Sequence, residues 1–178
     1  MLKRILLSVV MLVVFCGVVS AKKMAILNFN KGEVANMNNA CAVSLTEEQA
    51  EKSGEFTMKA EFEAKSSDKA PWAAVMGPER ASWIAYKTVN VEVFNPGDKE
   101  VKFTWMIKGA KGTDGPDNRR DWDIKFPPGK STQQIKIANE VCNDGKSPLD
   151  LKRIYIWAFW AQDEKPVTLY FQKLYLAD

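Results

Sequence analysis

Alternation of apolar and polar residues with a period of two dominates the chain and predicts a protein built from β-strands. In 89–93 each valine is separated from the next by a polar residue, and the same alternation marks 56–62 and 101–107. Because alternate side chains of a strand point to opposite faces of its sheet, each segment offers one face to a core and one to solvent. Helical periodicity is nearly absent, and one short helical turn is expected over 46–52 with Thr46 as its N-cap.

Turn-forming residues divide the chain into about ten strands. The strongest turn signals are 95–98 and 127–129, and a long polar loop is expected over 109–120. The expected strands lie at 24–29, 40–45, 56–62, 72–76, 89–93, 101–107, 122–126, around 135–137, at 151–160 and at 166–176. With no internal repeat, this pattern predicts an all-β protein, an antiparallel β-sandwich of jelly-roll type.

The segment 151–160 differs from the other strands because it is apolar on both faces. Two sets of residues alternate along it, Ile154, Ile156 and Ala158 on one face and Tyr155, Trp157 and Phe159 on the other. A sandwich provides a core on only one side of each sheet. In a jelly roll most successive strands cross between sheets, which places 151–160 with 54–63, 85–94 and 99–107. Since the outward positions of those strands are polar, we expect the aromatic set on the outer face and Trp160 on the core side.

The first 21 residues have the pattern of a secretory signal peptide. Lys3 and Arg4 precede an apolar run over 5–19, and small residues occupy the −3 and −1 positions of a cut after Ala21. The run is short for a membrane span, which needs about 20 residues. Cleavage leaves 22–178 as a single domain of ordinary size, secreted or periplasmic and without a membrane segment. An uncleaved anchor is the alternative.

Charge and cysteine content restrict the partners and the chemistry further. Loss of Lys3 and Arg4 lowers the net charge from +3 to +1. This charge lacks the basic excess that is typical of nucleic-acid-binding proteins. Cys41 and Cys142 remain after cleavage. In an oxidising compartment they can form one bridge across a long loop, or they can be two separately buried thiols, and the sequence leaves both possibilities open.

The absence of histidine argues against most catalytic classes. The chain contains none, which removes the usual general base, the usual zinc ligand and every serine–histidine or cysteine–histidine pair. The 22 acidic residues show no spacing that selects a pair of catalytic carboxylates, and no glycine-rich phosphate loop is present. The sequence therefore favours a binding protein over an enzyme.

Several short motifs, in order, resemble those of a known superfamily. They are LNFNKG (27–32), SLT (44–46), SWIAY (82–86), VEVFNP (91–96), FPPG (126–129), LDL (149–151) and LYFQKLYL (169–176). Over 24–176 the chain resembles carbohydrate-binding modules of the galactose-binding-like jelly-roll superfamily, and is similar to the modules attached to bacterial glycoside hydrolases such as agarases and β-galactosidases. The resemblance implies a non-catalytic module that binds a polysaccharide or oligosaccharide.

The resemblance also points to a lost metal site. Such modules often hold a structural calcium ion with two carboxylates, and the matching positions here are Asn30 and Gln172. Because calcium prefers charged oxygen ligands, two neutral amides weaken such a site, so we expect no metal and no cofactor. We expect the two amides to make hydrogen bonds where the ion would lie.

The candidate ligand-binding residues follow from the aromatic row and its polar neighbours. Aromatic rings stack on the apolar faces of sugars, while amide, carboxylate and ammonium groups bind the hydroxyls. The predicted site contains Tyr155, Trp157, Phe159, Glu92 and Asn90, with Arg120 and Trp122 as further candidates after the long polar loop. The leading hypothesis is a secreted, non-catalytic carbohydrate-binding protein. A protein-interaction or envelope-assembly domain that uses the same surface is the alternative, and the sequence leaves the glycan and the oligomeric state open.

Overall fold

The computed structural model describes residues 21–35, 41–64, 72–75, 82–109 and 115–178. The apolar run of the predicted signal peptide lies outside these residues. The described chain forms ten strands and one 3-10 helix: β1 (Lys23–Leu27), η1 (Phe29–Lys31), β2 (Cys41–Thr46), β3 (Thr57–Phe62), β4 (Trp72–Val75), β5 (Thr88–Asn95), β6 (Val101–Lys108), β7 (Arg119–Phe126), β8 (Gly129–Lys136), β9 (Ile156–Ala161) and β10 (Val167–Ala177). None of the described segments is a helix long and apolar enough to cross a membrane.

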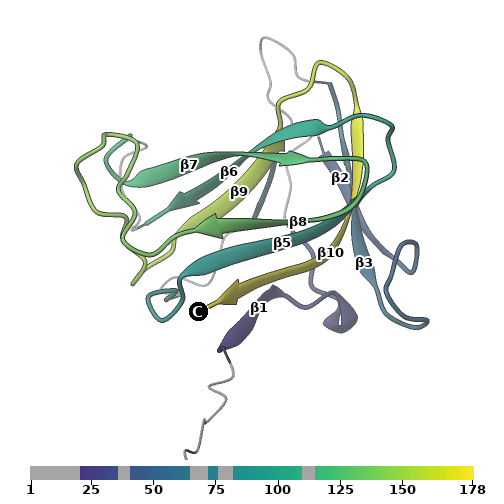
Figure 1. Cartoon of the computed structure of the whole chain (residues 1–178), viewed down its shortest axis with the longest axis horizontal. Coiled ribbons are helices and arrows are strands. Elements are labelled where there is room, and N and C mark those ends of the chain that lie inside the picture. Colours follow the sequence, from purple (N-terminus) through teal and green to yellow (C-terminus); the bar gives the residue numbers. More distant parts are fainter. Residues whose placement is uncertain (1–20, 36–40, 65–71, 76–81, 110–114) are drawn as a thin grey trace, which may run out of the picture.

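The strands form two antiparallel sheets that pack face to face (Figure 1). Sheet A has the order β2-β3-β10-β5-β8, and β1 pairs with the second half of β10. Sheet B has the order β4-β9-β6-β7. Figure 1 shows β6, β7 and β9 in one layer and β5, β8 and β10 in the other. The predicted all-β jelly-roll sandwich is thus confirmed.

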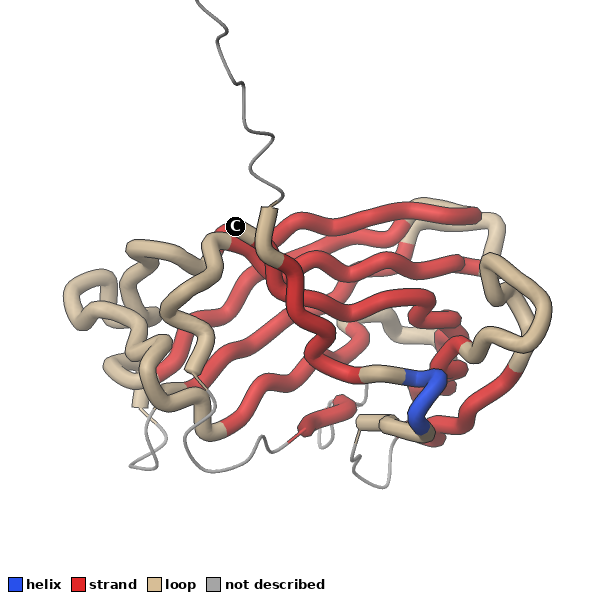
Figure 2. The backbone as a smooth tube through the Cα atoms, turned by 90° about the horizontal axis from the view of Figure 1, so that it is seen from below, coloured by secondary structure: helices blue, strands red, loops and turns tan. Residues whose placement is uncertain are grey.

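The expected helical turn over 46–52 is wrong. Thr46 ends β2, and its Oγ1 accepts a hydrogen bond from the backbone N–H of Glu48 at 3.1 Å. Gln49 has a φ of 59°, which a right-handed helix does not contain. The segment is therefore a turn between β2 and β3, and the described helical residues are those of η1, directly after the first strand (Figure 2).

The alternating strands bury the faces that their patterns indicate. Val89, Val91 and Val93 are fully buried in β5, and Phe103 and Trp105 are buried in β6. Each of these strands keeps polar residues on its other face, so a single orientation buries all of the apolar side chains. The expected turn over 95–98 is also present, between β5 and β6.

The placement of the strand around residue 157 departs from expectation in two ways. It begins only at Ile156, and it lies in sheet B between β4 and β6, whereas β3 and β5 belong to sheet A. Of the strands expected beside it, β6 alone is a hydrogen-bonded neighbour among the described strands. Since the outward direction of this strand was inferred from the wrong neighbours, its predicted orientation fails as well.

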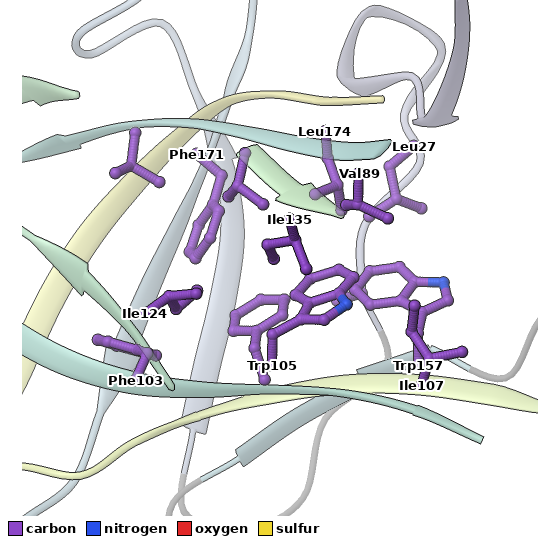
Figure 3. Packing of buried hydrophobic residues seen from close by; sticks show 14 of the residues in the cluster. Leu27, Val89, Phe103, Trp105, Ile107, Ile124, Ile135, Trp157, Phe171 and Leu174 are labelled. Atoms are coloured by element: carbon purple, nitrogen blue, oxygen red, sulfur yellow. The ribbon is translucent and has the colours of Figure 1, made fainter. Parts of the chain in front are cut away.

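Trp157 and Phe159 point into the core, so the prediction of an exposed aromatic row is wrong for both. Their exposed fractions are 2% and 1%. Register explains the orientation, because Phe159 lies opposite Trp105 and directly opposed residues of an antiparallel pair share a face. The ring of Trp105 stacks on Trp157 at 5.0 Å between centroids and on Phe159 at 5.9 Å, at the centre of the sandwich (Figure 3).

Cys41 and Cys142 are separate, buried thiols, which resolves the alternatives that the sequence left open. Cys41 begins β2, and Cys142 lies in the loop between β8 and β9. Burial raises the pKa of the Cys41 thiol to about 12, and the negative charge of Glu61 acts in the same direction. Cys41 therefore stays protonated in the folded protein at neutral pH.

Candidate binding face

The predicted site residues do not form one surface. Trp157 and Phe159 lie in the core, while Asn90 and Glu92 lie on the outer face of sheet A, across the sandwich from the outer face of sheet B. Tyr155 precedes β9 and its ring lies 5.4 Å from the Nζ of Lys108. The expectation of a single aromatic and polar patch on one sheet is therefore wrong, because β5 and β9 belong to different sheets.

Asn90 and Glu92 interact with side chains of sheet A. Asn90 is 4% exposed, and its Oδ1 accepts a hydrogen bond from Gln134 Nε2 at 3.3 Å while its Nδ2 donates to Thr88 Oγ1 at 3.0 Å. Glu92 forms an ion pair with Lys173, with 3.2 Å between Oε2 and Nζ. Asn90 thus has a structural role across the strand pair, and Glu92 belongs to the surface around β10.

Arg120 and Trp122 lie together near the start of β7. The guanidinium carbon of Arg120 is 5.9 Å from the centre of the Trp122 ring, and its Nε is 4.0 Å from a carboxylate oxygen of Glu140. Trp122 is partly buried and packs against the hydrophobic core, opposite Trp105 in the register. These contacts hold the start of β7 against the loop after β8, and they direct Trp122 inward.

Trp160 is the aromatic residue of β9 that faces outward. It lies opposite Thr104 of β6, whose neighbours Phe103 and Trp105 point into the core. The side chain is partly buried. The sequence predicts Trp160 on the core side, and this is wrong because the inward and outward faces of β9 are exchanged relative to the prediction.

Polar side chains of sheet B surround the outward positions beside Trp160. Gln162 Nε2 donates a hydrogen bond to Thr104 Oγ1, and that hydroxyl donates to Asp123 Oδ1 at 3.3 Å. Thr104 and Asp123 are directly opposed in the pairing of β6 with β7. We call Trp160, Lys102, Thr104, Asp123 and Gln162 the Trp160 face.

A cavity of about 390 Å³ opens on this face. It is lined by Lys102, Phe103, Asp123, Ile124, Lys125 and Gln162. Its volume lies at the lower end of the range of about 300–1,000 Å³ that small-molecule sites occupy. The cavity combines a carboxylate, an amide and two ammonium groups, which is a set of donors and acceptors for a ligand rich in hydroxyl groups.

Two signals in the sequence point to this face once the pairing of β6 with β9 is known. The polar outward positions of β6 are readable from its alternation with Phe103, Trp105 and Ile107. The pairing then fixes Trp160 beside Thr104. Sequence reasoning missed the residue because local alternation does not reveal which strands pair.

The residues at the expected calcium positions are bonded to protein groups. Asn30 Oδ1 accepts a hydrogen bond from the backbone N–H of Phe56 at 2.8 Å, and Gln172 Nε2 donates to the backbone carbonyl of Gln49. Neutral amides bonded in this way do not suit a hard cation. Within the described ranges, no cluster of three or more histidine, cysteine or carboxylate side chains is suited to a metal ion. The loss of calcium nevertheless stays a prediction.

Comparison with known proteins gives matches at the level of structure. No protein-family model and no curated protein matches the chain by sequence. The family 11 carbohydrate-binding module of the cellulosomal cellulase Lic26A-Cel5E of Clostridium thermocellum superposes with a TM-score of 0.62 at 14% identity, covering 88% of this chain and 95% of that module. The carbohydrate-binding module CBM27-1 of Caldicellulosiruptor saccharolyticus gives 0.55 at 12% identity, covering 88% of this chain and 97% of that one.

An exo-β-agarase also contains this fold as part of a larger protein. The superposition has a TM-score of 0.63 at 12% identity and covers 86% of this chain but 25% of the agarase chain. At such identities the likeness establishes the fold alone. The chain has the jelly-roll fold that these carbohydrate-binding modules share.

Proposed function

We propose that the protein is a secreted, non-catalytic carbohydrate-binding protein that holds its glycan on the Trp160 face. The observation that carries the proposal is the position of Trp160 beside a hydrogen-bonded chain of an amide, a hydroxyl and a carboxylate. The outward indole offers an apolar surface for the C–H face of a sugar ring. Gln162 and Asp123 offer donors and acceptors for the hydroxyl groups around that ring.

The structural neighbours support this ligand class. The family 11 module has been described in complex with a β-1,3-1,4-mixed-linked tetrasaccharide, and CBM27-1 in complex with mannohexaose. This chain has the same fold over nearly the full length of both modules. A glycan is therefore the first ligand to test on the outer face of either sheet.

Affinity electrophoresis against agar, xylan, mixed-linkage β-glucan, mannan and galactan tests the proposal. We expect retardation by at least one polysaccharide, clearly reduced in the variant Trp160→Ala. The matched control is Phe94→Ala, which removes a partly buried ring from the outer face of sheet A and should leave binding unchanged. A folded protein that binds none of these glycans would contradict the proposal and favour a protein-interaction role for the same face.

Secretion and the absence of catalysis are separate parts of the proposal. Mass spectrometry of exported protein should show a chain that begins at Lys22, as a cut after Ala21 requires. A reducing-sugar assay on the bound polysaccharide should detect no cleavage. Release of new reducing ends by the purified chain would overturn the non-catalytic part, and a full-length chain in the cytoplasm would overturn the export part.

A further inference from the structure

We propose that a second saccharide site lies between β1 and β3, on the side of the sandwich opposite the Trp160 face. The proposal takes its ligand class from the proposed function but depends on a separate set of residues. These residues line a pocket of about 350 Å³: Lys23, Ala25, Leu27, Asn28, Phe29, Asn30, Glu55, Phe56, Glu92, Gln172, Lys173, Leu174 and Tyr175. We call it the β10 pocket.

The pocket exists because β10 changes partners along one of its edges. Val167 to Phe171 pair with β3, whereas Leu174 to Ala177 pair with β1. Gln172 falls between the two pairings, and the register with β5 on the other edge also shifts there. The ends of β1 and β3 therefore leave a gap along β10, and β-bulges of this kind are over-represented beside binding sites because they redirect side chains. Figure 2 shows β1 leading into η1 on this side of the molecule.

An exposed aromatic ring lies at the rim of this gap. Phe56 is 38% exposed, although it directly precedes β3, whose first two residues are fully buried. The side chain of Asn30 fixes its position by accepting a hydrogen bond from its backbone N–H at 2.8 Å. Tyr175 lines the same pocket, and Lys23 Nζ lies 5.1 Å from its ring centre. An exposed ring whose backbone is bonded to η1 is a surface on which a sugar can stack.

The charges that line the pocket balance, which indicates an uncharged ligand. Two lysines and two glutamates contribute, namely Lys23, Lys173, Glu55 and Glu92. Lys173 Nζ bonds both Glu92, at 3.2 Å, and Glu51, at 2.6 Å, so its charge is already neutralised. A phosphate, a sulfate or a metal ion gains little from such a lining, whereas a neutral ligand rich in hydroxyl groups is accommodated.

Two amides supply the hydrogen-bonding groups that such a ligand needs. Asn30 uses its Oδ1 for the Phe56 backbone, and Gln172 uses its Nε2 for Gln49. The side-chain hydrogen bonds that these two residues make to the described part of the chain use Oδ1 and Nε2, which leaves Asn30 Nδ2 and Gln172 Oε1, and both residues line the pocket. One donor and one acceptor therefore remain available beside the ring of Phe56, which is a suitable pair for two neighbouring hydroxyl groups.

Two sites on opposite faces would allow one molecule to hold two polysaccharide chains. The pocket volume of about 350 Å³ is near the lower limit of about 300 Å³ for small-molecule sites, so it suits a short stretch of sugar rather than a long chain. Binding of a second chain raises the retention on a polymer matrix well above that of either site alone.

Calorimetric titration of the full chain tests the proposal. The probes are a mixed-linkage β-glucan tetrasaccharide, mannohexaose, xylohexaose and an agaro-oligosaccharide, each up to millimolar concentration. We expect two sites per chain for the best probe, one site in Phe56→Leu, one site in Trp160→Ala, and none in the double variant. Phe56→Leu removes the ring but keeps an apolar side chain, and a second variant, Gln172→Ala, should weaken the same site at least threefold. Phe94→Ala is the control and should keep two sites.

The outcomes separate this site from the Trp160 face. A single site that Trp160→Ala abolishes and Phe56→Leu leaves unchanged would overturn the second site and keep the proposed function. A single site that Phe56→Leu abolishes would keep the β10 pocket and refute binding at the Trp160 face. Absence of binding for every probe by a folded chain would overturn both.

Discussion

Substitution of Trp157 by alanine should destabilise the protein without removing its glycan-binding surface. The side chain is 2% exposed and stacks on Trp105 at 5.0 Å and on Phe159 at 6.0 Å. Truncation of a buried tryptophan to alanine costs about 3–5 kcal/mol, because it combines lost burial with an unfilled cavity. Since total stability is about 5–15 kcal/mol for typical domains, this loss is a large fraction of it.

Urea denaturation followed by far-UV circular dichroism measures the effect. With a denaturant slope of about 2 kcal/mol per molar, a loss of about 4 kcal/mol moves the midpoint down by about 2 M. Trp160→Ala, on the outer face, should cost less than about 2 kcal/mol. Folded Trp157→Ala should keep wild-type glycan affinity in the absence of urea. A wild-type midpoint combined with lost binding would refute the inward orientation of Trp157.

Three further predictions concern the binding face, a buried thiol and a turn. Thr104→Val should weaken glycan binding about three- to tenfold in calorimetry with little change in stability, because it removes the hydroxyl that links Gln162 to Asp123 through hydrogen bonds. An affinity equal to that of the wild type would exclude a role for these hydrogen bonds. Burial raises the pKa of the Cys41 thiol to about 12 in the folded protein, against 9.0 in the unfolded chain. Because the unfolded chain loses this proton first, stability should fall as the pH rises above 9. Thermal melts should show a less steep fall for Cys41→Ala. Asn95→Ala should lower the free energy of unfolding, measured by urea denaturation, by about 2–4 kcal/mol. The buried Asn95 amide makes three hydrogen bonds around the turn after β5, and each contributes about 1 kcal/mol. A loss below about 1 kcal/mol would show that the turn forms without this amide.

The fold could be predicted from the sequence where one face of a strand is polar. Val89, Val91 and Val93 alternate with polar residues, so one orientation alone buries the valines, and they are buried as expected. The same reasoning holds for Phe103 and Trp105 in β6. In such strands a shift of one residue would expose the whole apolar set, so the pattern and the structure agree.

The candidate site could not be predicted, because β9 is apolar on both faces. Trp157 and Trp160 point to opposite faces of β9. A shift of the strand register by one residue would exchange their faces, and the sequence does not disfavour it because both faces are apolar. The decisive information is the pairing of Thr104 with Trp160, which joins segments 56 positions apart. Local periodicity contains no record of such long-range pairing, and the jelly-roll rule applied in its place grouped β9 with β5 and its Glu92, which belong to the other sheet.

The orientation of the tryptophans toward a bound glycan is the most direct test of binding at the outer face of sheet B. The indole N–H signals of the chain's six tryptophans can be followed by NMR during titration with the best oligosaccharide, and Trp160→Phe assigns the signal of Trp160. The Trp160 signal should shift the most, while those of Trp105 and Trp157, buried in the core, should stay in place. Large shifts of Trp105 and Trp157 with an unchanged Trp160 signal would contradict binding on this face.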